Sequence, residues 1–329
     1  MRIAINGYGR IGRAVTRALF ERGLHSRIQI VAINDLTDSD MLLQLTRFDS
    51  TFGRFPGTVE LSQDALVIED RPIRLLREPD PARLPWNELD IDVVLECTGR
   101  FKHRAEAAAH LQAGAARVYA SHPMDDADLT VVYGVNHERL AGQQIISNAS
   151  CTTNCLAPLT KVLHEAFGIE QGMVNTVHSY TNDQSLLDKP HKNPYRARAA
   201  ALSMIPTTTG AAKAIGLVLP ELAGRMDGLA VRVPTPDVSL VDLTCTVARQ
   251  PGSVDNVNRA LQEGAARMPK GVMECNDLPL VSCDFRGYPV SCVADLNHTR
   301  VQDNLIKVLA WYDNEWAFSN RMLDVLEIW

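Results

Sequence analysis

The first residues of the chain carry a glycine pattern that few folds can accommodate. Gly7-Tyr8-Gly9-Arg10-Ile11-Gly12 follows the apolar run Arg2–Asn6 and precedes an amphipathic stretch that ends at Gly23. The first glycine permits a tight turn, the second lets a phosphate approach the backbone, and the third lets the helix pack closely on its strand. The pattern therefore predicts a strand–turn–helix unit whose helix N-terminus binds a pyrophosphate.

The end of the second apolar run supports a dinucleotide site. Asn34-Asp35 follow Ile28–Ile33, and Asp35 lies 23 residues after Gly12. An acidic side chain about 20 residues after the last glycine binds ribose hydroxyls, and its charge repels a 2′-phosphate. Asp35 therefore predicts NAD rather than NADP as the cofactor. The alternative interpretation leaves the glycines as an ordinary turn and Asp35 as a solvated strand end.

Strand and helix patterns alternate over residues 1–150. Further apolar runs at 92–95, 118–120, 130–133 and 144–147 predict strands, and the Ala-rich segment 103–116 predicts a helix. Strands that alternate with helices form a mostly parallel sheet covered on both faces. We therefore expect an α/β fold that begins with a doubly wound Rossmann domain over residues 1–150.

The pattern changes after Cys151. A helical pattern over 153–167 is followed by longer strands, of which the clearest is 238–247, where alternate residues share one face. Such alternation is typical of an antiparallel sheet that packs one face on helices. We expect an α+β catalytic domain over residues 151–315 with a mostly antiparallel sheet. The helical pattern over 316–329 is expected to join the first domain.

Composition excludes several classes of function. The net charge is -6, and no apolar run approaches the ~18 residues of a membrane span, so neither nucleic acid nor a membrane is an expected partner. The seven cysteines are scattered and form no Cys-x-x-Cys pair. They therefore predict neither a zinc site nor a disulfide framework. We expect no metal, and a reduced, cytoplasmic protein.

The segment 147–155, Ser-Asn-Ala-Ser-Cys-Thr-Thr-Asn-Cys, carries the predicted chemistry. Capping residues surround Cys151 at the expected start of a helix. A helix N-terminus or a nearby imidazolium lowers the pKa of a thiol, so we predict that Cys151 is a nucleophile and that Cys155 is a buried side chain. Such a nucleophile needs a base. His178 follows a predicted strand at its C-terminal end, although spacing alone does not select it among the nine histidines.

Four long motifs then occur in order along the chain. They are Ser150-Cys151-Thr152-Thr153-Asn154-Cys155, His178-Ser179-Tyr180-Thr181-Asn182-Asp183-Gln184, Thr207-Thr208-Thr209-Gly210-Ala211-Ala212-Lys213 and Trp311-Tyr312-Asp313-Asn314-Glu315. With these motifs the chain resembles the phosphorylating glyceraldehyde-3-phosphate dehydrogenase family, from Asn6 to Asp324. The resemblance implies that Cys151 attacks a small phosphorylated aldehyde, that His178 takes the thiol proton, and that inorganic phosphate releases an acyl phosphate.

The resemblance also implies binding roles. Thr181, Asp183 and Arg232 would hold the substrate phosphate, and Ser150, Thr152, Arg196, Thr209 and Gly210 would hold the attacking phosphate. Cofactor contacts are implied at Asn6, Gly7, Gly9, Arg10, Ile11, Gly12, Asp35, Arg77, Thr98, Phe101, Ser121, Pro190 and Asn314. Asn314 would orient the nicotinamide amide, and Pro190 would reach the adenosine of a neighbouring subunit in a homotetramer. From spacing alone, Arg232 could equally form a structural ion pair.

Two other functions stay open at this point. Ser121-His122-Pro123 and Phe318 resemble the sister branch, erythrose-4-phosphate dehydrogenase, in which water resolves the thioester. Thr181-Asn182 keeps the triose pattern, which favours glyceraldehyde 3-phosphate. The remaining alternative is a non-catalytic NAD-binding interaction protein, which the presence of both Cys151 and His178 disfavours.

Overall fold

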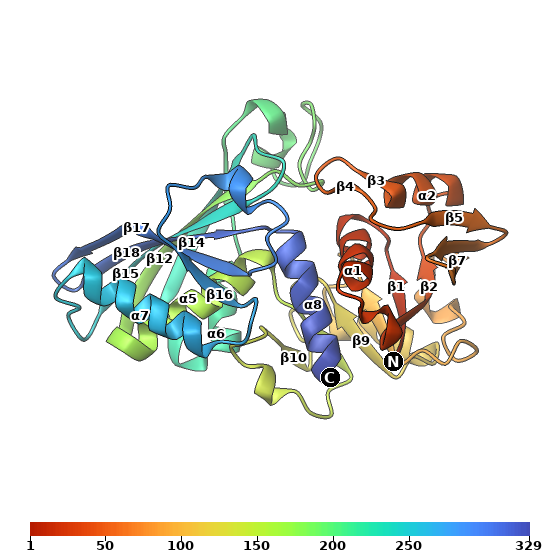
Figure 1. Cartoon of the computed structure of the whole chain (residues 1–329), viewed down its shortest axis with the longest axis horizontal. Helices are drawn as coiled ribbons and strands as arrows, with labels where there is room; N and C mark the ends of the chain where they lie inside the picture. The colour runs from red at the N-terminus through yellow and green to blue at the C-terminus, as the bar shows by residue number, and fades with distance from the viewer. The chain divides into compact units, whose positions relative to one another are not determined.

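The computed structural model describes residues 1–329, which divide into two compact units (Figure 1). The first comprises Met1–Val131, Glu138–Ala149 and Met322–Trp329. The second comprises Val132–His137 and Ser150–Arg321. Each unit is built around its own sheet, and the two are described in turn.

The first unit has a nine-stranded sheet in the order β10-β11-β9-β8-β1-β2-β7-β6-β5. All neighbours from β10 to β7 are parallel, whereas β7, β6 and β5 pair antiparallel. The strands are β1 (Arg2–Asn6), β2 (Gln29–Asn34), β5 (Val59–Ser62), β6 (Ala65–Ile68), β7 (Arg71–Leu76), β8 (Val93–Glu96), β9 (Arg117–Ala120), β10 (Leu129–Thr130) and β11 (Ile145–Ser147). The predicted mostly parallel sheet is thus confirmed. β1 lies between β2 and β8, so the strand order reverses at the strand that precedes the glycine turn, which is where such sheets bind ligands.

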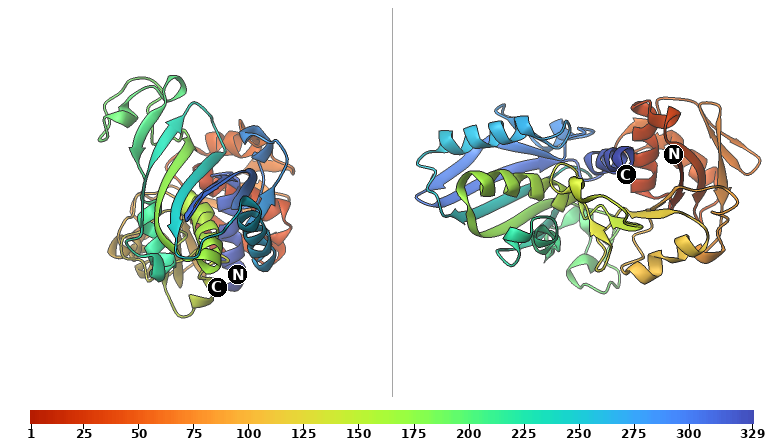
Figure 2. Two further views of the ribbon diagram at one scale, coloured as in Figure 1. Left: turned by 90° about the vertical axis from the view of Figure 1, so that its left-hand side faces the viewer. Right: turned by 90° about the horizontal axis from the view of Figure 1, so that it is seen from below.

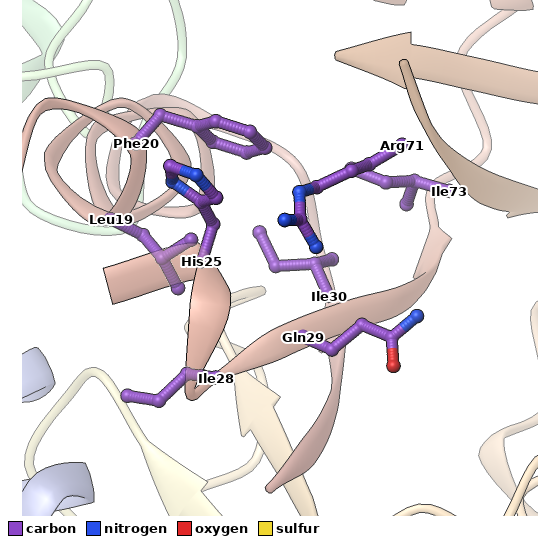
Figure 3. Close-up of a pocket in the computed structure, with 8 residues that line it drawn as sticks. All are labelled: Leu19, Phe20, His25, Ile28, Gln29, Ile30, Arg71 and Ile73. Carbon is purple, nitrogen blue, oxygen red and sulfur yellow. The ribbon is translucent and has the colours of Figure 1, made fainter. Parts of the chain in front are cut away.

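The helices of this unit are short apart from the first. They are α1 (Arg10–Glu21), α2 (Ser39–Arg47), α3 (Arg104–Ala107) and α4 (Ala109–Gln112), and a small hairpin joins β3 (Phe48–Asp49) to β4 (Gly53–Arg54). Leu19 and Phe20 of α1 lie with Ile30 of β2 and Ile73 of β7 around a small pocket (Figure 3). His25 stacks on the Phe20 ring, with 4.9 Å between ring centroids, and covers one side of it.

Two sequence predictions differ from the structure. The single helix expected over 103–116 is broken into α3 and α4, because Ala108 (φ -61°, ψ -17°) has the tighter geometry of a 3₁₀ turn. The strand expected over 130–133 ends at Thr130. The N–H of Val132 donates to the side-chain Oδ1 of Asn136 at 2.8 Å, and this local turn replaces further strand pairing.

A buried polar network joins the carboxyl ends of β1 and β8. Glu96 Oε2 accepts from Asn6 Nδ2 at 2.6 Å and from His110 Nε2 at 3.1 Å, and Glu96 Oε1 accepts from the Thr98 N–H at 2.8 Å. Trp86 Nε1 donates to His110 Nδ1, so the imidazole proton lies on Nε2, facing Glu96. Burial favours the neutral acid, but the hydrogen bonds from His110, Thr98 and Asn6 hold the pKa of Glu96 below its ordinary value.

Loss of this carboxylate is expected to destabilise the first unit strongly. Glu96→Ala leaves the buried donors of Asn6 and His110 without an acceptor, which costs about 3 kcal/mol of unfolding free energy. Urea unfolding followed by circular dichroism measures the change, with Glu88→Ala, an exposed position, as the matched control. A loss of unfolding free energy no larger than that of the control would show that the network contributes nothing to stability.

The second unit has a seven-stranded sheet in the order β13-β14-β12-β15-β18-β17-β16. Its strands are β12 (Ile169–Ser179), β13 (Ile205–Thr208), β14 (Met226–Val233), β15 (Ser239–Val247), β16 (Met273–Asn276), β17 (Cys292–Gln302) and β18 (Leu305–Tyr312). Only β12–β14 and β16–β17 are parallel pairs, so the sheet is mostly antiparallel, as predicted. In β15 the alternate residues from Ser239 to Val247 are buried, which confirms the predicted face.

Helices cover one face of this sheet. They are α5 (Cys151–Phe167), α6 (Ala211–Val218) and α7 (Val254–Arg267), and α5 packs between the other two (Figure 1, Figure 2). The helix α8 (Trp316–Ile328) contributes its residues from Met322 onward to the first unit. The predicted loop over 179–203 contains only the short turns η4 (Tyr195–Ala197) and η5 (Ala200–Leu202).

All seven cysteines are free thiols. None of the helices has both the length and the apolar character that a membrane span requires.

Candidate active site

Cys151 is the first residue of α5. The hydroxyl of Ser150 caps the helix by accepting from the Thr153 N–H at 3.1 Å, while the N–H groups of Cys151 and Thr152 act on the Cys151 thiol. The preceding Ala149 has φ +58°, a left-handed conformation that costs a non-glycine residue about 1 kcal/mol. The sequence prediction of a capped helix start at this cysteine is confirmed.

His178 lies at the C-terminal end of β12 and faces the thiol. Its Nε2 is 3.5 Å from Cys151 Sγ, and its Nδ1 is 2.7 Å from the carbonyl oxygen of Ser179. A carbonyl oxygen can only accept, so Nδ1 carries the proton of the neutral imidazole and Nε2 presents its lone pair to the thiol. The side chain is buried. This tautomer is the one that a general base requires.

The pKa of the Cys151 thiol differs from the sequence prediction, which was that it is lowered. The start of α5 and the charge of Arg232 do act to lower the pKa of Cys151, but burial outweighs them and raises it. Burial and then the positive charge of Arg232 lower the pKa of His178 to about 3. Both shifts favour a neutral thiol beside a neutral imidazole. Because Sγ and Nε2 are within hydrogen-bonding reach, the imidazole is placed to accept the thiol proton directly, without a proton acceptor from solvent.

Tyr312 supports this pair from behind. Its hydroxyl lies 2.8 Å from Thr152 Oγ1 and 2.9 Å from Thr176 Oγ1, and its ring meets the His178 ring edge to face. The hydroxyl of Thr152 is therefore directed into the protein and is bound there. Sequence reasoning quoted Tyr312 only as part of a motif and assigned it no role. Its contacts depend on β18 reaching β12 through β15, which local sequence does not reveal.

Asn314 follows β18 and has a fixed orientation. Its Oδ1 accepts from Ser179 Oγ at 2.8 Å and from Ser239 Oγ at 2.9 Å. With the carbonyl end held by two hydroxyls, the amide NH₂ is the end left to donate to a ligand. Sequence reasoning assigned no role to Ser179 or Ser239, although both hold this side chain.

Two arginines occupy different places in the second unit. Arg232 of β14 is the register partner of His178 and donates through Nη1 to the Ser179 carbonyl at 2.9 Å and to Thr181 Oγ1 at 3.3 Å. Its Nε is buried and has no partner in the protein. Arg196 instead forms an ion pair with Asp183 and donates through Nε to Thr207 Oγ1 at 3.0 Å.

The predicted phosphate residues lie around the two arginines. Thr181 contacts Arg232, and Asp183 pairs with Arg196 while its charge also acts on Arg232. Ser150 and Thr152 lie at the start of α5, and Thr209 and Gly210 precede α6, whose first N–H, that of Ala211, bonds Thr209 Oγ1 at 3.2 Å.

The glycine turn fits a bound pyrophosphate. A Cβ on Gly7 would lie 2.7 Å from the Thr98 nitrogen, and one on Gly12 would lie 2.5 Å from the Gly7 carbonyl oxygen, so the chain itself requires these two glycines. A Cβ on Gly9 would meet no atom within 4 Å. Gly9 is also the N-cap of α1 and supplies no side-chain cap, so the free helix N-terminus faces open space where phosphates can approach.

Asp35 lies directly after β2. Its Oδ2 accepts from the Tyr8 N–H at 2.7 Å and its Oδ1 from the Thr37 N–H at 2.9 Å. Partial burial favours the neutral acid, but these hydrogen bonds, with the charge of Arg13, hold the pKa of Asp35 below its ordinary value. It is therefore an anion at neutral pH, tied to the same turn that would hold the pyrophosphate.

The other predicted cofactor residues are spread over both units. Asn6, Arg10, Ile11, Arg77, Thr98, Phe101 and Ser121 belong to the first unit, and Pro190 and Asn314 to the second. Of these, Asn6 and Thr98 bond to Glu96, and Phe101 packs edge to face on His110. Arg77 is held by the Thr37 carbonyl at 3.1 Å. Pro190 is exposed in the 179–203 loop.

Comparison with known proteins agrees with this geometry. The family described as glyceraldehyde 3-phosphate dehydrogenase, NAD binding domain, matches residues 1–104, and its C-terminal domain matches residues 150–314. The chain is 56% identical to the glyceraldehyde-3-phosphate dehydrogenase of Pseudomonas aeruginosa over 98% of this chain and 96% of that protein. It is 54% identical to that of Xanthobacter flavus and 50% to that of Mycolicibacterium smegmatis, over 98% and 100% of this chain and 97% and 98% of those proteins. The chain belongs to the glyceraldehyde-3-phosphate dehydrogenase family.

Proposed function

We propose that this protein oxidises D-glyceraldehyde 3-phosphate with NAD and inorganic phosphate to 1,3-bisphosphoglycerate. The observation that carries the proposal is the 3.5 Å approach of Cys151 Sγ to a His178 Nε2 that is held in the tautomer of a base. A non-catalytic NAD-binding protein would have no need of this arrangement. A trap for acyl phosphates tests the product: hydroxylamine added after the enzyme has been removed should yield a hydroxamate only from reactions that contained phosphate.

The first half of the reaction uses the pair directly. His178 Nε2 takes the thiol proton as Cys151 Sγ bonds to the aldehyde carbon, and the new oxyanion lies near the start of α5. The N–H groups there and the protonated Nε2 stabilise that oxyanion. Bound NAD would supply the hydride acceptor for this carbon, which would leave a thioester on Cys151. A phosphate oxygen then attacks the thioester carbonyl, the C–S bond breaks, and the thiolate recovers its proton.

The two arginines serve the two phosphates in this proposal. Arg232, with its unpartnered Nε and its contact to Thr181, suits the substrate phosphate. Arg196, which contacts Thr207 and the Thr208 carbonyl just before Thr209 and Gly210, suits inorganic phosphate. Because Tyr312 binds the Thr152 hydroxyl and Ser150 caps α5, we assign these two residues to that phosphate through the start of α5 and not through the Thr152 hydroxyl. A carboxylate repels phosphate, so we assign Asp183 the task of orienting Arg196 through their ion pair.

Asp35 is expected to select NAD against NADP. Asp35→Asn keeps an acceptor for the Tyr8 N–H but removes the charge that repels a 2′-phosphate, so the ratio of kcat/KM for NADP to that for NAD should rise about tenfold or more. Steady-state kinetics with both cofactors measure it, and Asp40→Asn, an exposed charge in α2, is the control. An unchanged ratio would remove Asp35 from cofactor selection.

We also propose that the protein is a homotetramer. The sheet face of the second unit opposite the helices exposes Met173, Leu229 and Leu305, and Met173 and Leu305 line an open hollow of about 700 Å³. The 179–203 loop exposes Leu202 by 81%. Exposed apolar surface of this kind is typical of subunit interfaces.

Gel filtration tests the assembly. The expected mass is close to four times the 36.3 kDa of one chain, and Met173→Glu should shift it toward smaller species because the charge would be buried. Glu170→Gln, an exposed change on the same strand, should leave the mass unaltered. A mass near that of one chain would contradict the proposal. The free thiols favour a reducing compartment such as the cytoplasm.

A further inference from the structure

Two buried carboxyl groups lie beside Asn314, and the proposed reaction does not use either of them. Asp237, in the connection from β14 to β15, and Asp313, directly after β18, are each 1% exposed. β15 and β18 pair antiparallel, with Ser239 opposite Tyr312. That register brings the residues just before β15 next to those just after β18, so the two buried carboxyl groups lie close enough for the charge of Asp313 to act on Asp237.

Asp313 organises the turn that carries Asn314. One oxygen, Oδ1, accepts from the Glu315 N–H at 2.9 Å and from the Trp316 N–H at 2.6 Å. The other, Oδ2, accepts from the Gly287 N–H at 2.8 Å. These bonds span the backbone of Asn314 on both sides. Burial raises the pKa of Asp313, and these three N–H donors act against that rise by stabilising the ionised form.

Asp237 has the opposite surroundings. Both of its oxygens are buried without a well-formed hydrogen bond, and the one N–H that acts on its carboxyl group is that of the next residue, Val238. The next residue, Val238, has φ +67°, a conformation rarely adopted by a β-branched residue, so the local chain is held there by its surroundings. A buried carboxylate without donors is costly, whereas a carboxylic acid that donates its proton to Asp313 is not. Burial, then the charges of Asp313 and Glu315, raise the pKa of Asp237 to about 8.

We propose that Asp237 and Asp313 share one proton, and that this shared proton is a positioning device that holds Asn314 for the reaction. The effect reaches Asn314 by two routes. Asp313 fixes its backbone, and the Asp237 segment carries Ser239, whose hydroxyl fixes its side chain. The part of the inference that concerns Asn314 rests on the proposed function, because it takes Asn314 to contact the cofactor.

The shared proton should be lost as the pH rises, and with it the positioning of Asn314. Folding raises the pKa of Asp237 to about 8, so its protonated carboxyl group stabilises the folded protein fully below the ordinary carboxyl pKa range. This stabilisation is lost as the pH rises through about 8. Above that pH the two carboxylates repel each other. The charged groups that face Asp237 are Asp313 and Glu315, both in the turn after β18, and the loop before β17 contributes the Gly287 N–H to Asp313. Deprotonation therefore adds a third negative charge to an already acidic cluster.

Two substitutions at Asp237 distinguish the effect of the shared proton from the effect of losing the side chain. Asp237→Asn replaces the acid by an amide whose N–H donates to Asp313 at every pH. Asp237→Ala removes the donor at every pH. The kcat of each variant is divided by that of the unsubstituted protein from about pH 6.5 to about pH 9.5, which cancels the shared titration of Cys151 and His178.

The expected ratio for Asp237→Asn is near one below pH 7 and rises about fivefold above pH 9, the effect of one hydrogen bond. For Asp237→Ala the ratio is about one fifth at low pH and approaches one at high pH. A pH-independent ratio for Asp237→Asn, or equal losses in both variants, would overturn the shared proton as the device.

Melting temperature across the same pH range needs no turnover and separates the two proposals. Relative to Asp237→Asn, the unsubstituted protein should lose stability as the pH rises toward about 8 and show no further relative loss above it, whatever aldehyde it oxidises. If this loss of stability is seen but the protein does not oxidise the triose, the shared-proton proposal stands and the proposed function is rejected. Parallel melting curves would reject the shared proton even in an active enzyme.

Discussion

Replacing Cys151 by serine is expected to reduce kcat for aldehyde oxidation by about 10⁴-fold or more, because a hydroxyl is a far weaker nucleophile than a thiol next to the same base. The Ser150 cap and the start of α5 do not depend on the thiol, so the helix should be preserved. The glycine turn of the first unit is untouched. NAD affinity, measured by equilibrium titration, should therefore remain close to that of the unsubstituted protein.

The exposed thiol of Cys283 provides the matched control. Cys283→Ser should retain full activity, and iodoacetamide should inactivate it as it does the unsubstituted protein. Iodoacetamide should label position 151 first, because its thiol is the one within reach of a base. Equal loss of oxidation and of NAD binding in Cys151→Ser would contradict the assigned role of this residue.

The second large effect is expected at His178. His178→Asn removes the lone pair that faces Sγ, and kcat should fall about 10²- to 10⁴-fold, the usual contribution of a general base. Burial raises the pKa of Cys151, so without the imidazole its thiol has no internal acceptor for the proton. The rate of alkylation near pH 7 should then fall about tenfold, and it should recover as the pH rises and hydroxide deprotonates the thiol.

His298→Asn is the control for this substitution, because His298 belongs to the same unit and is more than half exposed. It should change neither kcat nor the alkylation rate. Alkylation of His178→Asn at the unsubstituted rate near pH 7 would mean that the start of α5 and Arg232 alone generate the thiolate.

Sequence was sufficient for those parts of the fold that local patterns specify. The bounds of β1 and the capped start of α5 follow from apolar runs, glycines and capping residues that act over a few positions. The alternation in β15 likewise predicted its buried face. The break at Ala108 was not predicted, since an Ala-rich segment has no helix-breaking residue and only the local geometry divides it.

The contacts that tune the site depend on strands that are distant in sequence. Tyr312 reaches Thr176 across 136 positions, and Asn314 meets Ser179 across 135, so no spacing rule predicts either pair. The pKa of Cys151 could not be predicted from the sequence for the same reason. The helix start was visible in the sequence and does lower the pKa, but the burial that outweighs it depends on the packed second unit.

The central claim is that a thioester on Cys151 is resolved by inorganic phosphate. The most direct test is NADH formation at fixed NAD with glyceraldehyde 3-phosphate or erythrose 4-phosphate, each with and without inorganic phosphate. Our account predicts fast turnover of the triose that requires phosphate, with the tetrose a poor substrate. Faster turnover of the tetrose that is indifferent to phosphate would mean that water resolves the thioester, and would contradict the account.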